Sequence, residues 1–244
     1  MFLNKLTVDK GTNLNLEKYP FSIPTIKHLS EYEFKSNITF FVGENGTGKS
    51  TLLEALAYKI GFNTSGGSKN NSYINNQDNT LGETLKLSWL PKVSNGFFLR
   101  AETFFQFAEH IDSLAEIDRK AYIPYGGKSL LEQSHGESFF SLFNNRFSHR
   151  EKSIYLLDEP EAALSPSRQL ALLRTLKQHD VRKKSQFIIA THSPILLGYP
   201  DATIVSFDNE ELKEITYEET EHYLITKYFI NNKEKFLSEI FEDL

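Results

Sequence analysis

The part of the sequence best suited to chemistry is a glycine-rich loop at residues 43–50, which reads GENGTGKS. It fits the pattern G-x-x-x-x-G-K-[ST], in which glycines let backbone N–H groups turn inward around phosphate oxygens. Lys49 is expected to place its charge on the terminal phosphates, and Ser50 to offer a hydroxyl ligand to Mg²⁺. A chance match in such a chain has odds of roughly 1%, given a glycine frequency of ~7%. The loop therefore predicts a site for ATP and Mg²⁺, in which the nucleotide-binding residues are Gly43, Glu44, Asn45, Gly46, Thr47, Gly48, Lys49, Ser50 and Thr51.

Two adjacent carboxylates, Asp158 and Glu159, follow the apolar run at residues 154–157. At the end of a buried strand, Asp158 suits a ligand of Mg²⁺ acting through water. Glu159 suits a general base that polarises the attacking water. The alternative is an acidic strand end that caps a neighbouring helix. The presence of the phosphate loop favours the catalytic interpretation.

A sheet and helices are needed to position these residues. Continuous apolar runs bounded by polar turns suit strands of a parallel sheet buried under helices, and three such runs occupy residues 38–42, 154–157 and 187–190. A helix over residues 50–60 should follow the phosphate loop. Another should begin after Ser165, with Pro166 in its first turn, and it carries at helical spacing Leu170, Leu173 and Leu176. Strand, helix and strand in this order are typical of an α/β layer.

The remaining segments are expected to surround this sheet. Residues 63–80 are rich in Asn, Ser and Gly, which predicts a surface loop. Residues 81–133 mix strand-like and helical pieces and are expected to form a small helical lobe beside the sheet. The tail at residues 220–241 is expected to be helical, with side chains available for packing at Tyr223, Leu224, Tyr228, Phe229 and Phe236. The predicted fold is one α/β domain over residues 1–244, with a mainly parallel central sheet under helices and a lateral lobe.

The composition excludes several other classes of protein. The 244 residues include no cysteine, which rules out disulfides, Cys-based metal sites and thiol catalysis. The formal net charge of −5 gives no global field that favours nucleic acid. The first residues lack a secretory signal pattern, and no window reaches the ~18 apolar residues of a membrane span. We therefore expect a cytoplasmic protein with no direct membrane insertion.

Four segments resemble motifs of the ABC ATPase superfamily, in the order that the superfamily has them. Residues 134–138 (SHGES) resemble its signature motif, and residues 158–160 (DEP) its acidic motif. Residues 162–165 (AALS) resemble its D-loop, and residues 190–193 (ATHS) its switch-histidine segment. The likeness covers residues 38–207 and is particularly close to small stand-alone ATPases related to SMC and Rad50-type heads. It implies a P-loop NTPase fold with an ABC-type ATPase head.

The resemblance also implies roles for residues outside the phosphate loop. Ser134 and Gly136 would touch the γ-phosphate of an ATP held by a partner subunit, so that ATP binding produces a head-to-tail homodimer. His192 would sense the γ-phosphate and complete a catalytic group with Glu159 and Lys49. Simpler interpretations exist for each segment, because SHGES also fits an S-x-x-E capping box and a lone histidine is more often structural.

Some positions depart from the family pattern. Ser165 stands where transporter ATPases often carry the Asp of the D-loop. No clear glutamine stands at the expected Q-loop position, where Glu102 is our candidate and a surface helix residue is the alternative. Tyr19 or Phe21 could stack on adenine, and core packing is the better expectation for Phe21.

The sequence thus predicts an ATPase in which Mg²⁺-dependent ATP binding and hydrolysis drive ATP-gated head-to-tail dimerisation. We expect coupling, through an unidentified partner protein, to a soluble process such as nucleic-acid maintenance or defence, with direct binding of nucleic acid left open. One alternative is an energy-coupling ATPase subunit of a membrane transporter, against which the absent glutamine and the unusual signature segment count. Another is a nucleotide-gated binding switch with little turnover, against which Glu159 counts.

Overall fold

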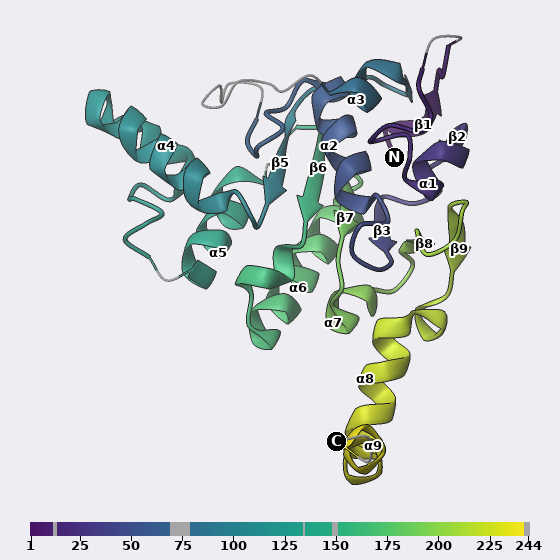
Figure 1. Ribbon diagram of the computed structural model, residues 1–244. Coiled ribbons are helices and arrows are strands. Elements are labelled where there is room, and N and C mark those ends of the chain that lie inside the picture. The colour runs from purple at the N-terminus through teal and green to yellow at the C-terminus, as the bar shows by residue number, and fades with distance from the viewer. Residues whose placement is uncertain (12–13, 69–78, 134, 148–150, 242–244) are drawn as a thin grey trace.

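The computed structural model describes residues 1–244 except 12–13, 69–78, 134, 148–150 and 242–244. Its central feature is a six-stranded sheet in the order β5-β6-β7-β3-β8-β9 (Figure 1). Neighbouring strands are parallel except for the antiparallel pair of β8 and β9. The strands are β3 (Ile38–Val42), β5 (Gly96–Arg100), β6 (Ser153–Asp158), β7 (Ser185–Ala190), β8 (Thr203–Ser206) and β9 (Lys213–Ile215). The three predicted apolar runs therefore form adjacent parallel strands.

The two faces of this sheet carry separate hydrophobic cores. Along β3, Phe40 belongs to one core and Phe41 to the other, because successive side chains of a strand point to opposite faces. The Phe41 face is covered by α2 (Lys49–Ile60), and the Phe40 face by α5 (His135–Arg146) and α6 (Pro166–Arg182). Every residue of β3, β6 and β7 is buried. Burial on both sides explains why these runs are continuously apolar.

A second, antiparallel sheet, absent from the sequence prediction, packs beside α2. Its strand order is β2-β1-β4, and its elements and the adjoining short helices are β1 (Leu3–Val8), α1 (Pro24–His28), β2 (Glu31–Glu33), α3 (Thr80–Thr84) and β4 (Leu85–Trp89). The buried Gln186 of β7 joins the two sheets. Its side chain accepts hydrogen bonds from the backbone N–H groups of Phe2 and Leu3 at 2.9 and 2.8 Å. It also donates to the carbonyl of Leu3 at 3.0 Å.

The helical lobe is smaller than the sequence suggested. It consists of α4 (Phe104–Ile117), the 3-10 helix η1 (Arg119–Tyr125) and α5, and Figure 1 shows α4 extending away from the sheet. β4 and β5 lie within the stretch 81–133 but belong to the two sheets. β5 pairs residue by residue with β6, so its apolar side chains contribute to the sheet cores. The organisation of residues 1–244 as one domain stays a prediction.

The start of the Asn-rich segment 63–80 also differs from the predicted surface loop. Asn63 is buried. Gly67 forms an antiparallel bridge with Phe98 of β5 through backbone hydrogen bonds of 2.7 and 3.0 Å. Residues 69–78 lie outside the described part of the chain. The described start of this segment is therefore packed along the edge of the central sheet.

α6 begins where the sequence predicted, but its buried face differs. Ser165 is the cap residue and Pro166 lies in the first turn, although the Ser165 side chain makes no cap hydrogen bond. Leu176 is buried as expected, whereas Leu170 is exposed and Leu172 is buried instead. Positions 172 and 176 are one helical turn apart and therefore share the face that packs on the sheet.

The C-terminal tail forms α8 (Glu221–Asn231) and α9 (Lys233–Phe241), which extend away from the sheet in Figure 1. No described residue of either helix is buried. Phe236 packs on Tyr228 and Phe229, with ring centroids 5.5 and 5.7 Å apart. Tyr228, Phe229 and Phe236 thus pack on one another, whereas Tyr223 lies against Tyr217 beside the core, with ring centroids 4.5 Å apart.

Candidate nucleotide site

The phosphate loop runs from the end of β3 to the start of α2 and contains glycines with positive φ. Gly43, Gly46 and Gly48 have φ values of +139°, +82° and +103°, which residues with side chains rarely adopt. A Cβ at Gly48 would also lie 3.2 Å from side-chain atoms of Ile23 and Ile26. The glycines thus permit the tight turn that brings the positive N-terminal end of α2 to this loop.

Lys49, the first residue of α2, is buried and turns its side chain back onto the loop. Its ammonium donates to the carbonyls of Gly43 at 2.6 Å and Glu44 at 2.7 Å. Burial lowers the pKa of Lys49 from its ordinary value, while nearby carboxylates, Glu159 first among them, act in the opposite direction. A bound phosphate oxygen would be a stronger acceptor for this ammonium than a carbonyl is.

Ser50 joins α2 to the end of β6, because its hydroxyl donates to Oδ1 of Asp158 at 2.9 Å. Asp158 is buried, and this burial raises the pKa of its carboxyl to about 6, against the opposing effects of Arg100 and Ser50. A hydroxyl and a carboxylate side by side are oxygen donors of the kind that Mg²⁺ binds together with water and phosphate. The pair therefore fits the magnesium ion that the phosphate loop implies.

Arg100 ends β5 opposite Asp158 and lies among three carboxylates. Its Nε is 3.5 Å from Oδ2 of Asp158. Its Nη1 is 3.4 Å from Oε2 of Glu54, and its Nη2 is 3.1 Å from Oε2 of Glu102. The Glu102 side chain is 79% exposed and meets the site through this ion pair. Glu102 was a predicted candidate and Arg100 was not, although the runs FFLR and IYLLD both end in a charged residue, of opposite sign.

Glu159 adopts a left-handed backbone conformation, with φ 51° and ψ 50°, which is strained for a residue with a side chain. Its backbone N–H donates to the carbonyl of Ala190 in β7 at 2.9 Å, and the 3-10 helix η2 (Pro160–Ala163) begins at the next residue. The side chain is 44% exposed, and its Oε1 lies 3.6 Å from Nε2 of His192. The turn leaves this carboxylate accessible at the carboxyl end of β6, as a base acting on water requires.

His192 lies between β7 and α7 (Pro194–Leu197). Its backbone N–H donates to Oε1 of Glu161, and its Nδ1 lies 2.8 Å from Nε2 of His222 in α8. Burial, followed by the charge of Lys49, lowers the pKa of His192 from its ordinary value. His222 was not among the predicted site residues, and no local pattern in the sequence marks it.

A buried amide connects the D-loop-like segment with the switch-histidine segment. Gln169 of α6 donates to the carbonyl of Leu164 at 2.9 Å and accepts from the hydroxyl of Ser193 at 2.5 Å. The Ser193 hydroxyl also accepts from the first N–H groups of α7. Ser165, at the D-loop position, has its hydroxyl 3.1 Å from that of Ser167. The two segments are thus held to each other through one side chain that sequence analysis missed.

The signature-like segment is described only in part. Ser134 lies outside the described residues. Gly136 lies in the first turn of α5, where a Cβ would be 2.7 Å from Nη1 of Arg168 in α6. In Figure 1, α5 lies in the lobe beside β5, whereas the phosphate loop follows β3, three strands along the sheet.

A cavity of about 310 Å³ adjoins the start of α2, and its lining residues are Tyr19, Pro20, Thr51, Glu54, Asn79, Thr80 and Arg100. Tyr19 is 70% exposed, and its hydroxyl lies 3.3 Å from Oγ1 of Thr51. Phe21 is buried in the core, as expected for a packing residue. Of the two aromatic candidates, Tyr19 is therefore the one placed beside the nucleotide-binding segment.

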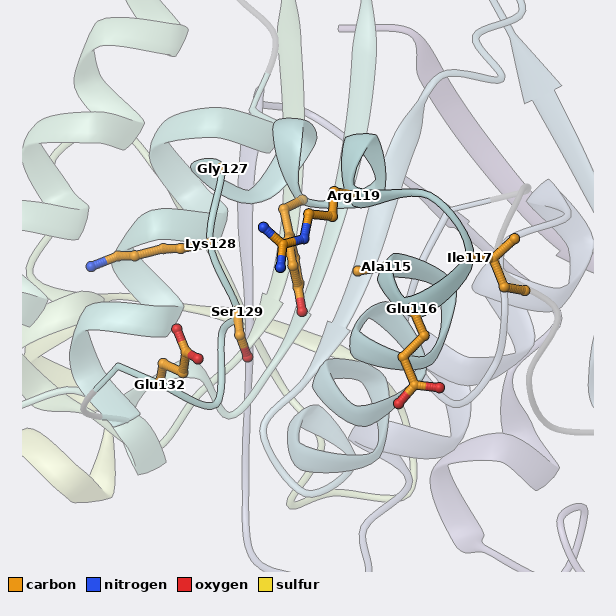
Figure 2. A pocket seen from close by; sticks show the side chains of 9 residues that line it. Ala115, Glu116, Ile117, Arg119, Gly127, Lys128, Ser129 and Glu132 are labelled. Carbon is orange, nitrogen blue, oxygen red and sulfur yellow. The ribbon is translucent and has the colours of Figure 1, made fainter.

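Two of the other cavities bear on the predicted residues. One of about 310 Å³ extends from Gly43 to α8, with Asp208 and His222 among its lining residues. Another, of about 610 Å³, lies in the lobe and is shown in Figure 2. Basic and acidic side chains both line this lobe cavity, including Arg119 and Glu132. Of the predicted site residues that the structure describes, none lines this lobe cavity.

The fold and the site define the class of protein. A glycine-rich phosphate loop joins the buried parallel strand β3 to a helix, and the acidic pair Asp158 and Glu159 lies at the carboxyl end of β6. In the sheet, β7 lies between β3 and β6. This is the arrangement of a P-loop NTPase. A comparison with family models goes further: the AAA_23 family, described as "AAA domain", matches residues 21–242. The chain belongs to this family.

Curated relatives carry names from ABC transport. A protein of Staphylococcus aureus (strain COL), named as an ABC transporter ATP-binding protein, is 26% identical over 185 residues, which are 69% of this chain and 32% of the relative. A protein from strain N315 with the same kind of name gives the same values. The chain thus spans about a third of the length of these relatives.

Solved structures show the same fold. An ATP-binding cassette of an ABC transporter aligns with a TM-score of 0.52 at 14% identity, covering 93% of this chain and 96% of that chain. The cbiO1 protein of Clostridium perfringens, part of the ABC transporter complex cbiONQ, has a TM-score of 0.51 at 17% identity, covering 98% and 100%. An SMC head bound to the C-winged helix domain of ScpA has a TM-score of 0.50 at 14% identity, covering 88% and 98%. The predicted P-loop α/β fold, that of an ABC-type ATPase head, is confirmed. Membership of the AAA_23 family supports ATP hydrolase activity.

Proposed function

We propose that this chain binds ATP with Mg²⁺ at the phosphate loop and hydrolyses it with Glu159 as the base. The observation that carries the proposal is the 2.9 Å hydrogen bond between Ser50 and Asp158, with Glu159 next in the chain and the His192 imidazole 3.6 Å from it. A metal-ligand pair, a base and an imidazole thus lie at the carboxyl ends of parallel strands, where α/β folds bind their ligands.

In the proposed reaction, Lys49 and the N–H groups of the loop bind the β- and γ-phosphates. Ser50 and Asp158 would hold the magnesium ion, which when bound neutralises charge that develops on the phosphate oxygens. Glu159 takes a proton from water as the water oxygen bonds to the γ-phosphorus. The bond to the β–γ bridging oxygen breaks, and its electron pair leaves with ADP. His192 contacts the γ-phosphate.

We further propose that two chains pack head to tail around two ATP molecules. Each chain has one phosphate loop and one signature-like segment, and within a chain Gly136 lies in the lobe, three strands along the sheet from the loop. A γ-phosphate held at one loop would offer charged acceptors to the N-terminal end of α5 in the second chain. Hydrolysis would remove these contacts and loosen the pair.

Cysteine crosslinking tests this shared site, because the chain has no native cysteine. One Glu159→Gln chain would carry Ser134→Cys and another would carry Asn45→Cys. Asn45 is chosen over its neighbour Gly46 because Gly46 has a φ of +82°, at which a side chain is strained. Mixed with ATP and Mg²⁺, the two chains should form an intermolecular crosslink, and with ADP they should form little.

The control for this experiment replaces Asn45→Cys by Lys86→Cys, at an exposed position of β4 in the N-terminal sheet. That pair should not crosslink with ATP, and a pair carrying Lys49→Ala should not crosslink either. A crosslink that forms equally without ATP contradicts the head-to-tail arrangement. So does the absence of a crosslink in folded protein that retains ATP.

We propose that ATP hydrolysis is coupled to a cytoplasmic process and not to membrane transport. Nucleic-acid maintenance and defence are examples. The reason is that the signature segment SHGES differs from the LSGGQ of transporter ATPases. The names of the curated relatives favour a second candidate, the energy-coupling subunit of a transporter. Among the described residues, no helix has the length and apolar character needed to cross a membrane. Purification of the Glu159→Gln protein with ATP separates the candidates: a stoichiometric membrane protein supports the transporter, and bound nucleic acid supports the first proposal.

A further inference from the structure

Two histidines from distant parts of the chain meet beside the proposed catalytic residues. His192 follows β7, and His222 is the second residue of α8. Nδ1 of His192 lies 2.8 Å from Nε2 of His222, and the ring centroids are 4.8 Å apart with 58° between the planes. At this distance the two nitrogens form a hydrogen bond, so one carries a proton and the other presents a lone pair.

The surroundings of both imidazoles favour their neutral form. Burial is the largest cause that lowers the pKa of each from its ordinary value, and the charge of Lys49 lowers both further. Nearby carboxylates act in the opposite direction without reversing the result. A neutral imidazole carries one N–H. The hydrogen bond therefore has two possible forms, in which either His192 donates from Nδ1 or His222 donates from Nε2.

The surroundings of the other ring nitrogen of His192 distinguish these two forms. Nε2 of His192 is buried, lies 3.6 Å from Oε1 of Glu159, and has no hydrogen-bond partner among the residues that the structure describes. If Nδ1 carried the proton, Nε2 would direct a lone pair toward a carboxylate, which is electrostatically unfavourable. If Nε2 carries the proton, its N–H faces that carboxylate, and Nδ1 becomes the acceptor. His222 is then the donor.

We propose that His222 is a positioning residue: its Nε2–H donates to Nδ1 of His192 and so keeps the His192 proton on Nε2, from which the N–H can donate a hydrogen bond to a γ-phosphate oxygen. The consequence for hydrolysis rests on the proposed function, whereas the assignment of the protons rests on the two distances and the unpartnered nitrogen. α8, none of whose residues is buried, thereby contributes a positioning residue to the proposed site.

Nitrogen-15 NMR of the full chain without nucleotide tests the proton assignment independently of turnover. Long-range ¹H–¹⁵N spectra distinguish the Nδ1–H and Nε2–H forms of an imidazole, and the chain has only 7 histidines. The variants His192→Gln and His222→Gln identify the two signals by their loss. We expect the Nε2–H form for both His192 and His222.

Two variants at position 222 then test the cause. His222→Phe keeps a ring but removes the donor, so the nitrogen shifts of His192 should move toward an average of the two tautomers. In His222→Gln the amide can still donate, and the Nε2–H form of His192 should persist. An Nδ1–H form of His192 in the unmodified protein overturns the proposal. An unchanged His192 spectrum in folded His222→Phe protein overturns it as well.

Kinetics add a readout that a purely structural role would not give. His222→Phe should lower kcat for ATP hydrolysis about tenfold with little change in KM, as expected for one lost hydrogen bond in the transition state. His222→Gln should restore most of the rate, and Tyr223→Phe, at the next position of α8, should match the unmodified protein. Equal losses in the Phe and Gln variants contradict the proposal. If the unmodified protein does not hydrolyse ATP, the proposed function fails, while the NMR result still decides the tautomer.

Discussion

The two halves of the candidate site differ in how completely they are built without a ligand. In the binding half, Ser50 and Asp158 are hydrogen-bonded to each other, and Lys49 is bonded to two carbonyls of the loop. In the hydrolysis half, the Glu159 carboxylate is 44% exposed on a strained backbone, and Nε2 of His192 has no hydrogen-bond partner in the described part of the chain. The polar groups of the binding half are thus hydrogen-bonded to one another, whereas those of the hydrolysis half are available to bind a nucleotide and a water molecule. ATP binding and ATP hydrolysis should therefore be separable by mutation.

The largest effect is expected in the binding half. Lys49→Ala removes the ammonium that would pair with the phosphates, so ATP affinity should fall by about 10²-fold, the scale of hydrogen bonds to charged groups, and turnover should be lost. Calorimetric titration with ATP and a phosphate-release assay measure the two effects. Lys59→Ala, at an exposed position in the last turn of the same helix, should retain both. Normal ATP affinity in folded Lys49→Ala protein would remove Lys49 from the site.

A smaller and more selective effect is expected in the hydrolysis half. Glu159→Gln keeps the shape of the side chain but removes the base, so single-turnover hydrolysis should slow by ~10²-fold or more while ATP affinity stays close to normal. Rapid-quench measurement on pre-bound ATP isolates this step. The exposed Glu210→Gln is the matched control. Fast hydrolysis by the Glu159 variant would show that another group activates the water.

The smallest effect concerns stability and depends on pH. The pKa of Asp158 is raised from 3.8 to about 6 in the folded protein, chiefly by burial. The folded state therefore binds this proton more readily than the unfolded chain does, so the free energy of unfolding falls as the pH rises from about 4 to about 6, and the loss is complete above that range. Asp158→Asn should raise the free energy of unfolding of the nucleotide-free protein by about 2 kcal/mol at pH 7.5. Below about pH 4 the gain should vanish, because the carboxyl is then neutral in both states.

Chemical denaturation at the two pH values measures this difference, with Asp201→Asn at an exposed position as the control. The same Asp158→Asn variant should lose the Mg²⁺ dependence of ATP binding. An equal stability gain at both pH values would assign the effect to something other than the buried charge. The expected result would show that the buried charge of Asp158 lowers the free energy of unfolding of the nucleotide-free protein.

The central part of the fold could be predicted because burial on both faces leaves a continuous apolar run. This holds for β3, β6 and β7, and the glycine loop marks the start of α2. The N-terminal sheet could not be predicted in this way. β1 reads LNKLTV, is only half buried, and pairs with β4, which lies far along the chain, so its neighbours are set by tertiary packing. β8 and β9 are too short to give a clear period.

The residues of the candidate site also fall into those that could be predicted from the sequence and those that could not. Residues in contiguous motifs, such as Lys49 and Asp158, could be named from the sequence, and their roles stay predictions until they are tested by mutation. Arg100 becomes recognisable only when β5 and β6 pair and bring it opposite Asp158. His222 and Gln169 meet their partners through the packing of separate helices, which leaves no spacing signal in the sequence.

In the central sheet, β3 lies between β7 and β8, which are made long after it during synthesis. Because a chain leaves the ribosome from its N-terminus, the strand that carries the phosphate loop emerges with both of its edges unpaired. Gln186, which ties β7 to the first residues, also arrives late. A nascent chain that ends before residue 185 therefore has the loop sequence but lacks the strands that shape it. Nucleotide can begin to protect the new protein from unfolding and proteolysis only after β7 has left the exit tunnel.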